Sequence, residues 1–312
     1  MVDKFEELRV GNSRDFWTKK LHAAVDGQEL KDSQFCASST QWIAHGSDGI
    51  PARDYIQHIR THINALPSRV RTTRGRRTEH SSTECRACKA PFETTAHIIQ
   101  QCERTHGGRI KRHDAIVRVL AGALRNKGYV VTEEPHLRTV VGLRKPDLLA
   151  VKEDCVKVVD VQVVSGAHSL NHSHHLKTAK YRDIPQISSD IACYLGSALQ
   201  PVHRTVEFTS CTLSWRGVWS SDSADSLKKL GVSRATMHGI TTRVLQGSHT
   251  NFVRWNQATS VIRPYSGSRP QHPDGAATQQ PQQQRQHQQF PQLQRAQRLQ
   301  AQSFPGRPPA AP

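Results

Sequence analysis

The sequence predicts an α/β protein in which a mixed sheet is flanked by helices, preceded by a small metal-binding knuckle and a mainly helical region. Two observations predict the sheet: β-branched residues dominate several short runs between 129 and 164, and another such run covers 205–213. A third observation is that helical apolar spacing appears on both sides of these runs. One α/β core is therefore expected to extend from residue 109 to about 262.

The first segment, residues 1–66, is expected to be a mainly helical linker region. Its clearest helix is Pro51 to Leu66, with a proline in the first turn and Ile56, Ile59 and Ile63 on one face.

Arginine dominates the next stretch and opens the second predicted domain, residues 67–108. Five arginines fall within nine residues: Arg69, Arg71, Arg74, Arg76 and Arg77. The glycine and threonines between them leave no apolar stripe for a core, so the run is expected to be solvated and flexible until it contacts phosphate. A plain solvated linker is the alternative interpretation.

A compact set of possible metal ligands follows this run. Cys85, Cys88, His97 and Cys102 have the spacing C-x2-C-x8-H-x4-C. Two thiolates two residues apart can hold one ion from a tight turn, and a histidine and a third thiolate can close the tetrahedron. Four protein ligands leave no open position, so the expected ion is a structural zinc whose binding helps to fold the segment. His106 competes with Cys102 as the fourth ligand, and Cys102 is favoured.

The elements of the α/β core follow in order. A helix is expected from Arg109 to Lys127, ended by Gly128, which suits a left-handed cap. The expected strands are 129–133, 138–141, 147–151, 156–164 and 205–213, and the expected later helices are 172–182, 222–230 and 233–246. In the last helix, Met237, Ile240 and Val244 have core-facing spacing. The Gln-, Pro- and Arg-rich residues 263–312 are expected to be disordered.

Two acids within this core predict a catalytic metal site. Asp147 follows Lys145-Pro146, and Asp160 lies thirteen residues later within VKVVDVQVV. If the two lie on adjacent antiparallel strands, both carboxylates meet at one edge of the sheet and can bind Mg²⁺. Strand alternation also places Asp160 and Gln162 on one face and the neighbouring valines on the other. A turn aspartate and a hydrogen-bonded buried aspartate are the structural alternatives.

Further polar residues are placed near these acids. Asp114 lies at the edge of the apolar stripe of its helix and is a candidate additional metal ligand. Lys177 and Lys180 are three residues apart on the 172–182 helix, with Tyr181 one turn beyond Lys177. A lysine there could hold the attacking water or hydroxide and offset the charge that grows on the phosphorane. A solvated basic helix face is the alternative.

These residues together resemble the PD-(D/E)xK nuclease superfamily, although Gln162 stands where that pattern has its lysine. The knuckle, Arg112-His113-Asp114, Lys145-Pro146-Asp147, Asp160 and a lysine displaced onto the next helix resemble the restriction-like endonuclease of non-LTR retrotransposons that insert into ribosomal RNA genes. The upstream residues Trp17, Asp26-Gly27, Trp42-Ile43, Arg53-Asp54-Tyr55-Ile56 and Asn64-Ala65-Leu66-Pro67 look like the linker that follows the polymerase in that family. The resemblance covers roughly residues 10–260.

The resemblance implies a Mg²⁺-dependent endonuclease that nicks target DNA and leaves a 3′-hydroxyl to prime reverse transcription of the element RNA in the nucleus. Arg112 and His113 join the arginine run as expected nucleic-acid contacts. The chain has no Tyr/Phe-x-Asp-Asp polymerase signature, so we expect it to be the C-terminal portion of a larger reverse transcriptase.

Charge agrees with a nucleic-acid partner. The chain of 312 residues has 43 Lys+Arg against 26 Asp+Glu and a formal charge of +17, which attracts polyanions. No apolar run approaches a membrane span, so no membrane partner is expected, and the odd number of cysteines, 7, argues against a disulfide framework. Two alternatives to the nuclease are a nucleic-acid-binding module with a decayed site, and a second metal site at His168, His172, His174 and His175.

Overall fold

The valine- and leucine-rich runs form a four-stranded sheet in the computed structural model of the chain, which describes residues 13–44, 50–76, 78–166, 168–196 and 205–260. The strand order is β1 (Val130–Glu133), β4 (Leu148–Lys152), β5 (Cys155–Val164) and β6 (Thr205–Ser214). The first three strands are antiparallel neighbours, whereas β6 is parallel to β5. The mixed sheet expected from the sequence is confirmed.

A separate hairpin interrupts the chain between β1 and β4. It pairs β2 (Leu137–Thr139) with β3 (Gly142–Arg144). The predicted strand 138–141 therefore ends early, because the chain turns back after Thr139. Gly142 has a φ of 96°, a conformation that glycine adopts without strain, and the Thr139 hydroxyl donates to its carbonyl across 2.6 Å.

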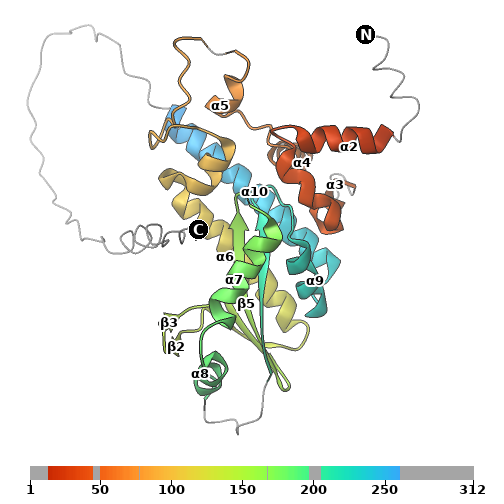
Figure 1. Ribbon diagram of the computed structural model, residues 1–312, viewed down its shortest axis with the longest axis vertical. Helices are drawn as coiled ribbons and strands as arrows, with labels where there is room; N and C mark the ends of the chain where they lie inside the picture. Colours follow the sequence, from red (N-terminus) through yellow and green to blue (C-terminus); the bar gives the residue numbers. More distant parts are fainter. Residues whose placement is uncertain (1–12, 45–49, 77, 167, 197–204, 261–312) are drawn as a thin grey trace, which may run out of the picture. The chain divides into compact units, whose positions relative to one another are not determined.

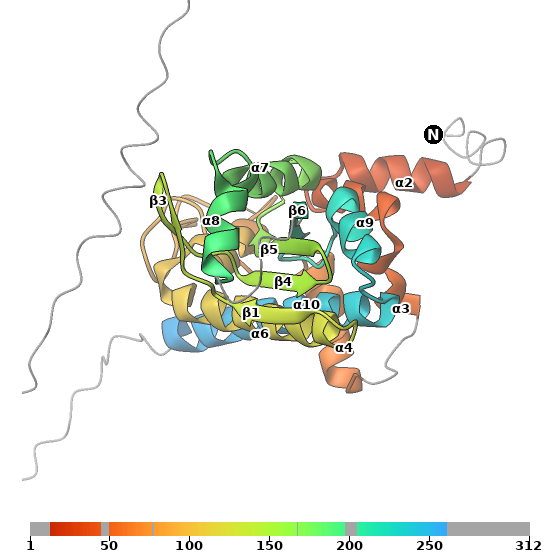
Figure 2. The ribbon, with the colours of Figure 1, turned by 90° about the horizontal axis from the view of Figure 1, so that it is seen from below.

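Helices cover both faces of the sheet, as Figure 2 shows. The helices on one face are α6 (His106–Arg125), α9 (Ser221–Lys229) and α10 (Arg234–Ser260), and those on the other are α7 (Leu170–Arg182) and α8 (Ile187–Tyr194). Alternation along β5 divides the core between them. Val159 and Val161 pack with α6 and α10, while Val156 and Val158 pack with α7 and α8.

The last helix is longer than its sequence predicts. A helix was expected over 233–246, but α10 spans 27 residues and ends at Ser260 (Figure 1). Ser248 and Asn251 are buried polar residues on its core-facing side, and they interrupt the apolar pattern that marks a helix. Phe252 and Trp255 restore that pattern one turn later and pack against the Cys/His region.

The remaining helical segments are short and precede α6. They are α2 (Ser13–Ala23), η1 (Gln28–Phe35), η2 (Ala37–Ser39), α3 (Gln41–Ala44), α4 (Ala52–His62), α5 (Arg69–Thr72), η3 (His97–Gln101) and η4 (Glu103–Thr105). The predicted helix Pro51–Leu66 ends at His62, and Asn64 beyond it has a φ of 57°. No helix over the described ranges is long and apolar enough to cross a membrane.

Residues Met1–Arg263 form one compact unit, and the expected disordered tail lies outside the described residues. The finer domain divisions at residues 66 and 108 stay predictions.

Arg216, after β6, joins the first segment to the sheet. Its guanidinium donates to the carbonyls of His62 and Asp26 across 2.6 and 2.8 Å and lies 3.5 Å from a Glu29 oxygen.

Two buried histidines in α4 make the stability of this region depend on pH. Burial lowers the pKa of both His58 and His62 from 6.5 to about 4. Between pH 6.5 and 4 these two histidines are therefore protonated in the unfolded chain but not in the folded chain. Their contribution to the free energy of unfolding is complete above pH 6.5 and is lost as the pH falls toward 4. The loss at pH 5 is about 2 kcal/mol for each histidine.

We therefore expect the His58→Gln variant to lose about 2 kcal/mol less than the parent between pH 7 and pH 5, as one titrating group is removed. Urea unfolding at both pH values measures this difference. His58 is the better choice for replacement because its Nδ1 has no hydrogen-bond partner in the described part of the chain, whereas His62 Nδ1 donates to the Arg216 carbonyl across 2.7 Å. An identical pH dependence in parent and variant would contradict the assignment.

Candidate functional site

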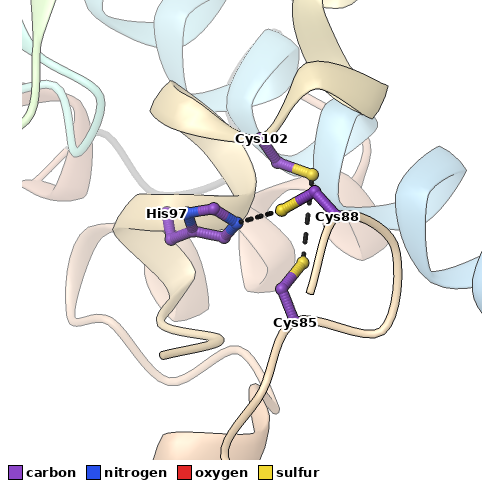
Figure 3. A group of neighbouring side chains, drawn as sticks. All are labelled: Cys85, Cys88, His97 and Cys102. Atoms are coloured by element: carbon purple, nitrogen blue, oxygen red, sulfur yellow. Dashed lines mark hydrogen bonds between the residues drawn. The ribbon is translucent and has the colours of Figure 1, made fainter. Parts of the chain in front are cut away.

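Four predicted metal ligands converge on one point in the structure. The ligand atoms of Cys85, Cys88, His97 and Cys102 all lie within 4.8 Å of one another and point toward a common centre (Figure 3). Cys85 Sγ lies 3.9 Å from Cys102 Sγ, and Cys88 Sγ lies 3.2 Å from His97 Nε2. A tetrahedral zinc with bonds of about 2.0–2.3 Å needs ligand atoms roughly 3.5–3.8 Å apart, so the cluster fits a zinc knuckle.

Local backbone structure places these ligands. Cys85 and Cys88 lie on a tight turn, in which the Cys85 N–H donates to the Ala90 carbonyl across 2.8 Å and Lys89 has a φ of 62°. His97 is the first residue of η3, and Cys102 follows its last residue, Gln101. The choice of Cys102 over His106 agrees with the cluster, because His106 lies instead at the exposed start of α6.

A buried acid holds the loop before the knuckle against it. Glu93 is fully buried, and its two carboxylate oxygens accept from the backbone N–H groups of Arg69 and Arg86 across 3.0 and 2.9 Å. The Arg86 side chain also donates to Glu93 and stacks 4.6 Å from the Trp255 ring. The knuckle is therefore packed against α10.

The two predicted catalytic acids face each other across the antiparallel pair β4 and β5. Leu148 pairs with Val159, so the next pair in the same register is Asp147 opposite Asp160. Asp147 accepts from the Val161 N–H. The Asp160 side chain is 4% exposed, and its Oδ2 faces the lysines of α7. The carboxyl pair expected at one sheet edge is present.

The pKa values of Asp147 and Asp160 differ because the two carboxyl groups lie close together. Burial and the neighbouring Asp147 raise the pKa of Asp160 to about 6, although Lys177 opposes this shift. Burial would also raise the pKa of Asp147, but hydrogen bonds from His113 and Asp160 hold it well below its usual range. Two carboxyls held this closely resist full ionisation unless a cation lies between them. Oxygen ligands of this kind suit Mg²⁺.

Both predicted lysines reach Asp160 from α7. Lys177 Nζ lies 3.0 Å and Lys180 Nζ 3.8 Å from Asp160 Oδ2. Lys180 also donates to the Tyr181 hydroxyl across 3.0 Å, and this hydroxyl donates to the Lys145 carbonyl across 3.1 Å. Burial raises the pKa of Tyr181 far above its usual range, so Tyr181 stays protonated and positions Lys180.

Gln162 fills the position where the PD-(D/E)xK pattern has a lysine. Its amide donates to the Ser173 carbonyl and the Thr212 hydroxyl, each across 2.8 Å, and so joins α7 to the sheet. The His-rich start of α7 is not gathered into a metal-binding group among the described residues. His174 bonds Ser210, and His175 bonds Asp222.

Sequence reasoning missed the role of His113. Its Nε2 lies 3.2 Å from Asp147 and its Nδ1 3.2 Å from Asp114, so the ring lies between the two carboxylates. The hydrogen bond with Asp147 raises the pKa of His113 to about 9. Asp114, expected as a further metal ligand, therefore reaches the acid pair through His113. The Arg112-His113-Asp114 motif was noted, but helix spacing alone does not show which residue turns toward the sheet.

Most predicted nucleic-acid contacts are already engaged within the protein. Arg71 and Arg74 form ion pairs with Asp26 at 2.5 and 2.7 Å, and Arg69 donates to the Glu84 carbonyl. These contacts, together with helix α5, order a stretch that was expected to be flexible. Arg76 is exposed, and Arg77 lies outside the described residues.

Arg112 has a different position from the one expected. Arg112 is 5% exposed, and its guanidinium donates to the Ser248 hydroxyl across 2.8 Å and to the side-chain amide oxygen of Gln100. This placement favours a structural role, in which Arg112 fixes α6 against α10 and η3, over the predicted phosphate contact.

The structure thus combines a Cys/His cluster that fits zinc with an α/β core that has paired carboxylates and lysines at one sheet edge. Comparison with known proteins places this combination in a family. The chain is 39% identical over 244 residues to a retrovirus-related Pol polyprotein from type-1 retrotransposable element R2 of Nasonia vitripennis, and 38% identical over 261 residues to one from Bradysia coprophila. It is 37% identical over 235 residues to a Pol polyprotein from type-2 retrotransposable element R2DM of Drosophila melanogaster. The chain therefore matches part of R2 retrotransposon Pol polyproteins, which confirms the resemblance.

These matches cover 78%, 84% and 75% of this chain but only 23%, 29% and 21% of the three relatives. The chain thus spans less than a third of the length of the Pol polyproteins that it resembles. No protein-family model matches it.

Proposed function

We propose that this chain is the endonuclease part of an R2-type retrotransposon protein and that it nicks target DNA in a Mg²⁺-dependent reaction. The observation that carries the proposal is the acid pair Asp147 and Asp160, which faces the lysines of α7 at one edge of the mixed sheet. This arrangement and the order of elements support a PD-(D/E)xK nuclease fold.

Asp147 and Asp160 would hold the catalytic Mg²⁺, which supplies an activated water and stabilises charge on the phosphate. Their oxygen chemistry fits this ion, and so does the burial of Asp160 opposite a second carboxylate. His113 holds Asp147 in its ionised form, ready to bind a cation. Lys177 brings a positive charge to the position where charge grows on the phosphate during cleavage.

The product of such a nick would carry a 3′-hydroxyl that primes reverse transcription of the element RNA. The polymerase would belong to another part of the parent protein. The knuckle would position nucleic acid, with a structural zinc at Cys85, Cys88, His97 and Cys102. We further propose ribosomal DNA as the target and the nucleus as the site of action.

Nicking of a plasmid tests this proposal. Supercoiled plasmid with a ribosomal DNA insert is expected to be converted to the nicked form in Mg²⁺ but not in EDTA, and a DNA polymerase is expected to extend the nick. Extension requires a free 3′-hydroxyl, so it reports the polarity of cleavage. Binding of the plasmid without cleavage in Mg²⁺ would contradict the nuclease and support a binding module with a decayed site.

The knuckle provides a separate prediction about zinc. Cys85→Ser is expected to lower the zinc content from about one ion per chain toward zero, because three ligands hold zinc much less tightly than four. Its binding to nucleic acid is expected to weaken, since η3 and α10 share a core with this cluster. Metal analysis by mass spectrometry measures the zinc. The matched control is Cys193→Ser, which replaces an exposed thiol outside the cluster. Unchanged zinc in Cys85→Ser would refute the site.

A further inference from the structure

A basic hollow lies between the start of α6 and the last turns of α10. Its volume is about 360 Å³, and three cationic side chains line it: Arg104, Lys111 and Arg254. All three are exposed, and none forms an ion pair with an acid in the described part of the chain. No aspartate or glutamate of the described ranges lines the hollow. Its local charge is therefore positive and unbalanced.

Two buried residues that carry side-chain N–H donors line this hollow. Asn251 is 3% exposed and Trp255 1% exposed, and both residues line the hollow. The Asn251 Nδ2 and Trp255 Nε1 atoms make no hydrogen bond among the described residues. Buried N–H groups without an acceptor are uncommon because they lose their hydrogen bonds to water. Two such residues in the lining of one hollow are what a site for an acceptor from outside the chain would show.

The backbone adds a third feature that favours an anion. The hollow includes Gly107 and Gly108, in the first turn of the 20-residue helix α6. No side chain caps this helix end, because the Thr105 hydroxyl donates instead to the carbonyls of Ile98 and Cys102. The N–H groups and positive dipole end of an uncapped helix attract anions such as phosphate.

Glycine at position 108 is required by the close approach of α10. A Cβ on Gly108 would lie 1.9 Å from Asn251 Oδ1. This contact places the Asn251 amide directly against the first turn of α6, so the unpartnered Nδ2 and the helix end belong to one site. Gly107, by contrast, faces open space, and a Cβ there would meet no atom within 4 Å.

We propose that this hollow binds a phosphate group of the nucleic-acid backbone. The inference rests on the proposed nucleic-acid function and extends it to a contact outside both the acid pair and the arginine run. Three exposed cations, two buried donors and a helix end without a side-chain cap together favour an anion with several acceptor oxygens. Because Thr105 and Cys102 connect the helix end directly to the knuckle, a phosphate here would fix the knuckle and the α/β core on the same strand of nucleic acid.

Removal of the positive charge is the first test, made on the full chain without Mg²⁺ so that cleavage does not contribute. The double variant Lys111→Gln/Arg254→Gln is expected to lower the log-log salt slope of duplex binding by about 0.9, which corresponds to about eightfold weaker binding at 0.1 M salt. Fluorescence anisotropy from 0.05 to about 0.3 M salt measures both quantities. The matched control is Arg234→Gln/Arg243→Gln, which removes two exposed charges from the earlier part of α10. An equal slope in both double variants would overturn the proposal.

A negative charge at the helix end is the second test. Gly107→Asp places a carboxylate in the hollow without a steric clash, and an acid in a first helical turn does not disfavour the helix. Thermal unfolding is therefore expected to be unchanged, while duplex binding weakens at least about tenfold. Gly239→Asp is the control, because a Cβ on this helical glycine also meets no atom within 4 Å. Equal binding by the two glycine variants would overturn the proposal.

Free phosphate distinguishes the source of the anion. If the hollow takes a backbone phosphate, 10 mM inorganic phosphate is expected to compete less well than a duplex at equal phosphate concentration, because the duplex is held at further contacts. If the variants bind inorganic phosphate more weakly than the parent but bind the duplex equally well, the nucleic-acid assignment is rejected. These measurements contain no Mg²⁺ and report binding only. If the chain binds DNA but does not cut it, the nuclease proposal fails, and the binding of the variants still tests the phosphate site.

Discussion

Asp147→Asn and Asp160→Asn are each expected to reduce Mg²⁺-dependent nicking by at least about a thousandfold, while duplex binding stays within a few-fold of the parent. Each substitution keeps the shape of the side chain and removes one negative oxygen from the pair that would hold the ion. Because carboxylates repel phosphate, their loss does not weaken DNA binding. Single-turnover cleavage and anisotropy on the same duplex separate the two effects.

Asp114→Asn is the matched control for this experiment. Asp114 is 40% exposed and contacts the acid pair only through the His113 ring, so its loss is expected to slow cleavage by about tenfold or less. Isothermal titration with Ca²⁺, which binds without supporting rapid cleavage, is expected to lose its signal in Asp147→Asn and to keep it in Asp114→Asn. Cleavage at the parent rate by either Asp147→Asn or Asp160→Asn would reject the active-site assignment.

The acid pair could be predicted because it depends on local pattern alone. Strand alternation and hairpin connectivity fix which residues of β4 and β5 are opposite each other, and Leu148 opposite Val159 sets the rest of the register. The knuckle was predictable for a similar reason, since its four ligands lie close in sequence and must satisfy one ion.

Contacts between distant elements could not be predicted in this way. Arg112 and His113 are adjacent on α6, yet the first turns toward Ser248 on α10 and the second toward Asp147 before β4. Which side of a helix faces which neighbour depends on the packing of the whole core. The pairing of Arg71 and Arg74 with Asp26 also joins positions more than forty residues apart. Composition indicated a solvated run, but tertiary contacts order it.

Lys177→Ala is expected to slow single-turnover cleavage by about two to three orders of magnitude while affinity for DNA and its salt slope stay near normal. Lys177 Nζ lies 3.0 Å from Asp160 and reaches it from α7, the helix that follows β5. Lys180→Ala is expected to have a smaller effect, because Lys180 is 3.8 Å from the same oxygen and bonds Tyr181. Single-turnover rates at saturating DNA measure this difference.

Rescue from the strand would separate a chemical role from a structural one. Gln162→Lys restores a lysine at the position that the PD-(D/E)xK pattern uses, on the same face of β5 as Asp160. In the Lys177→Ala background, it is expected to recover part of the lost rate, about tenfold or more, because the charge returns to the acid pair. Gln162→Ala in the same background is the control, since it also removes the bonds to Ser173 and Thr212 but adds no charge. If Lys177→Ala and Lys180→Ala both cut at the parent rate, the displaced lysine does not act in cleavage. The same conclusion holds if the two Gln162 variants recover the cleavage rate equally. The lysines of α7 would then belong to the binding surface.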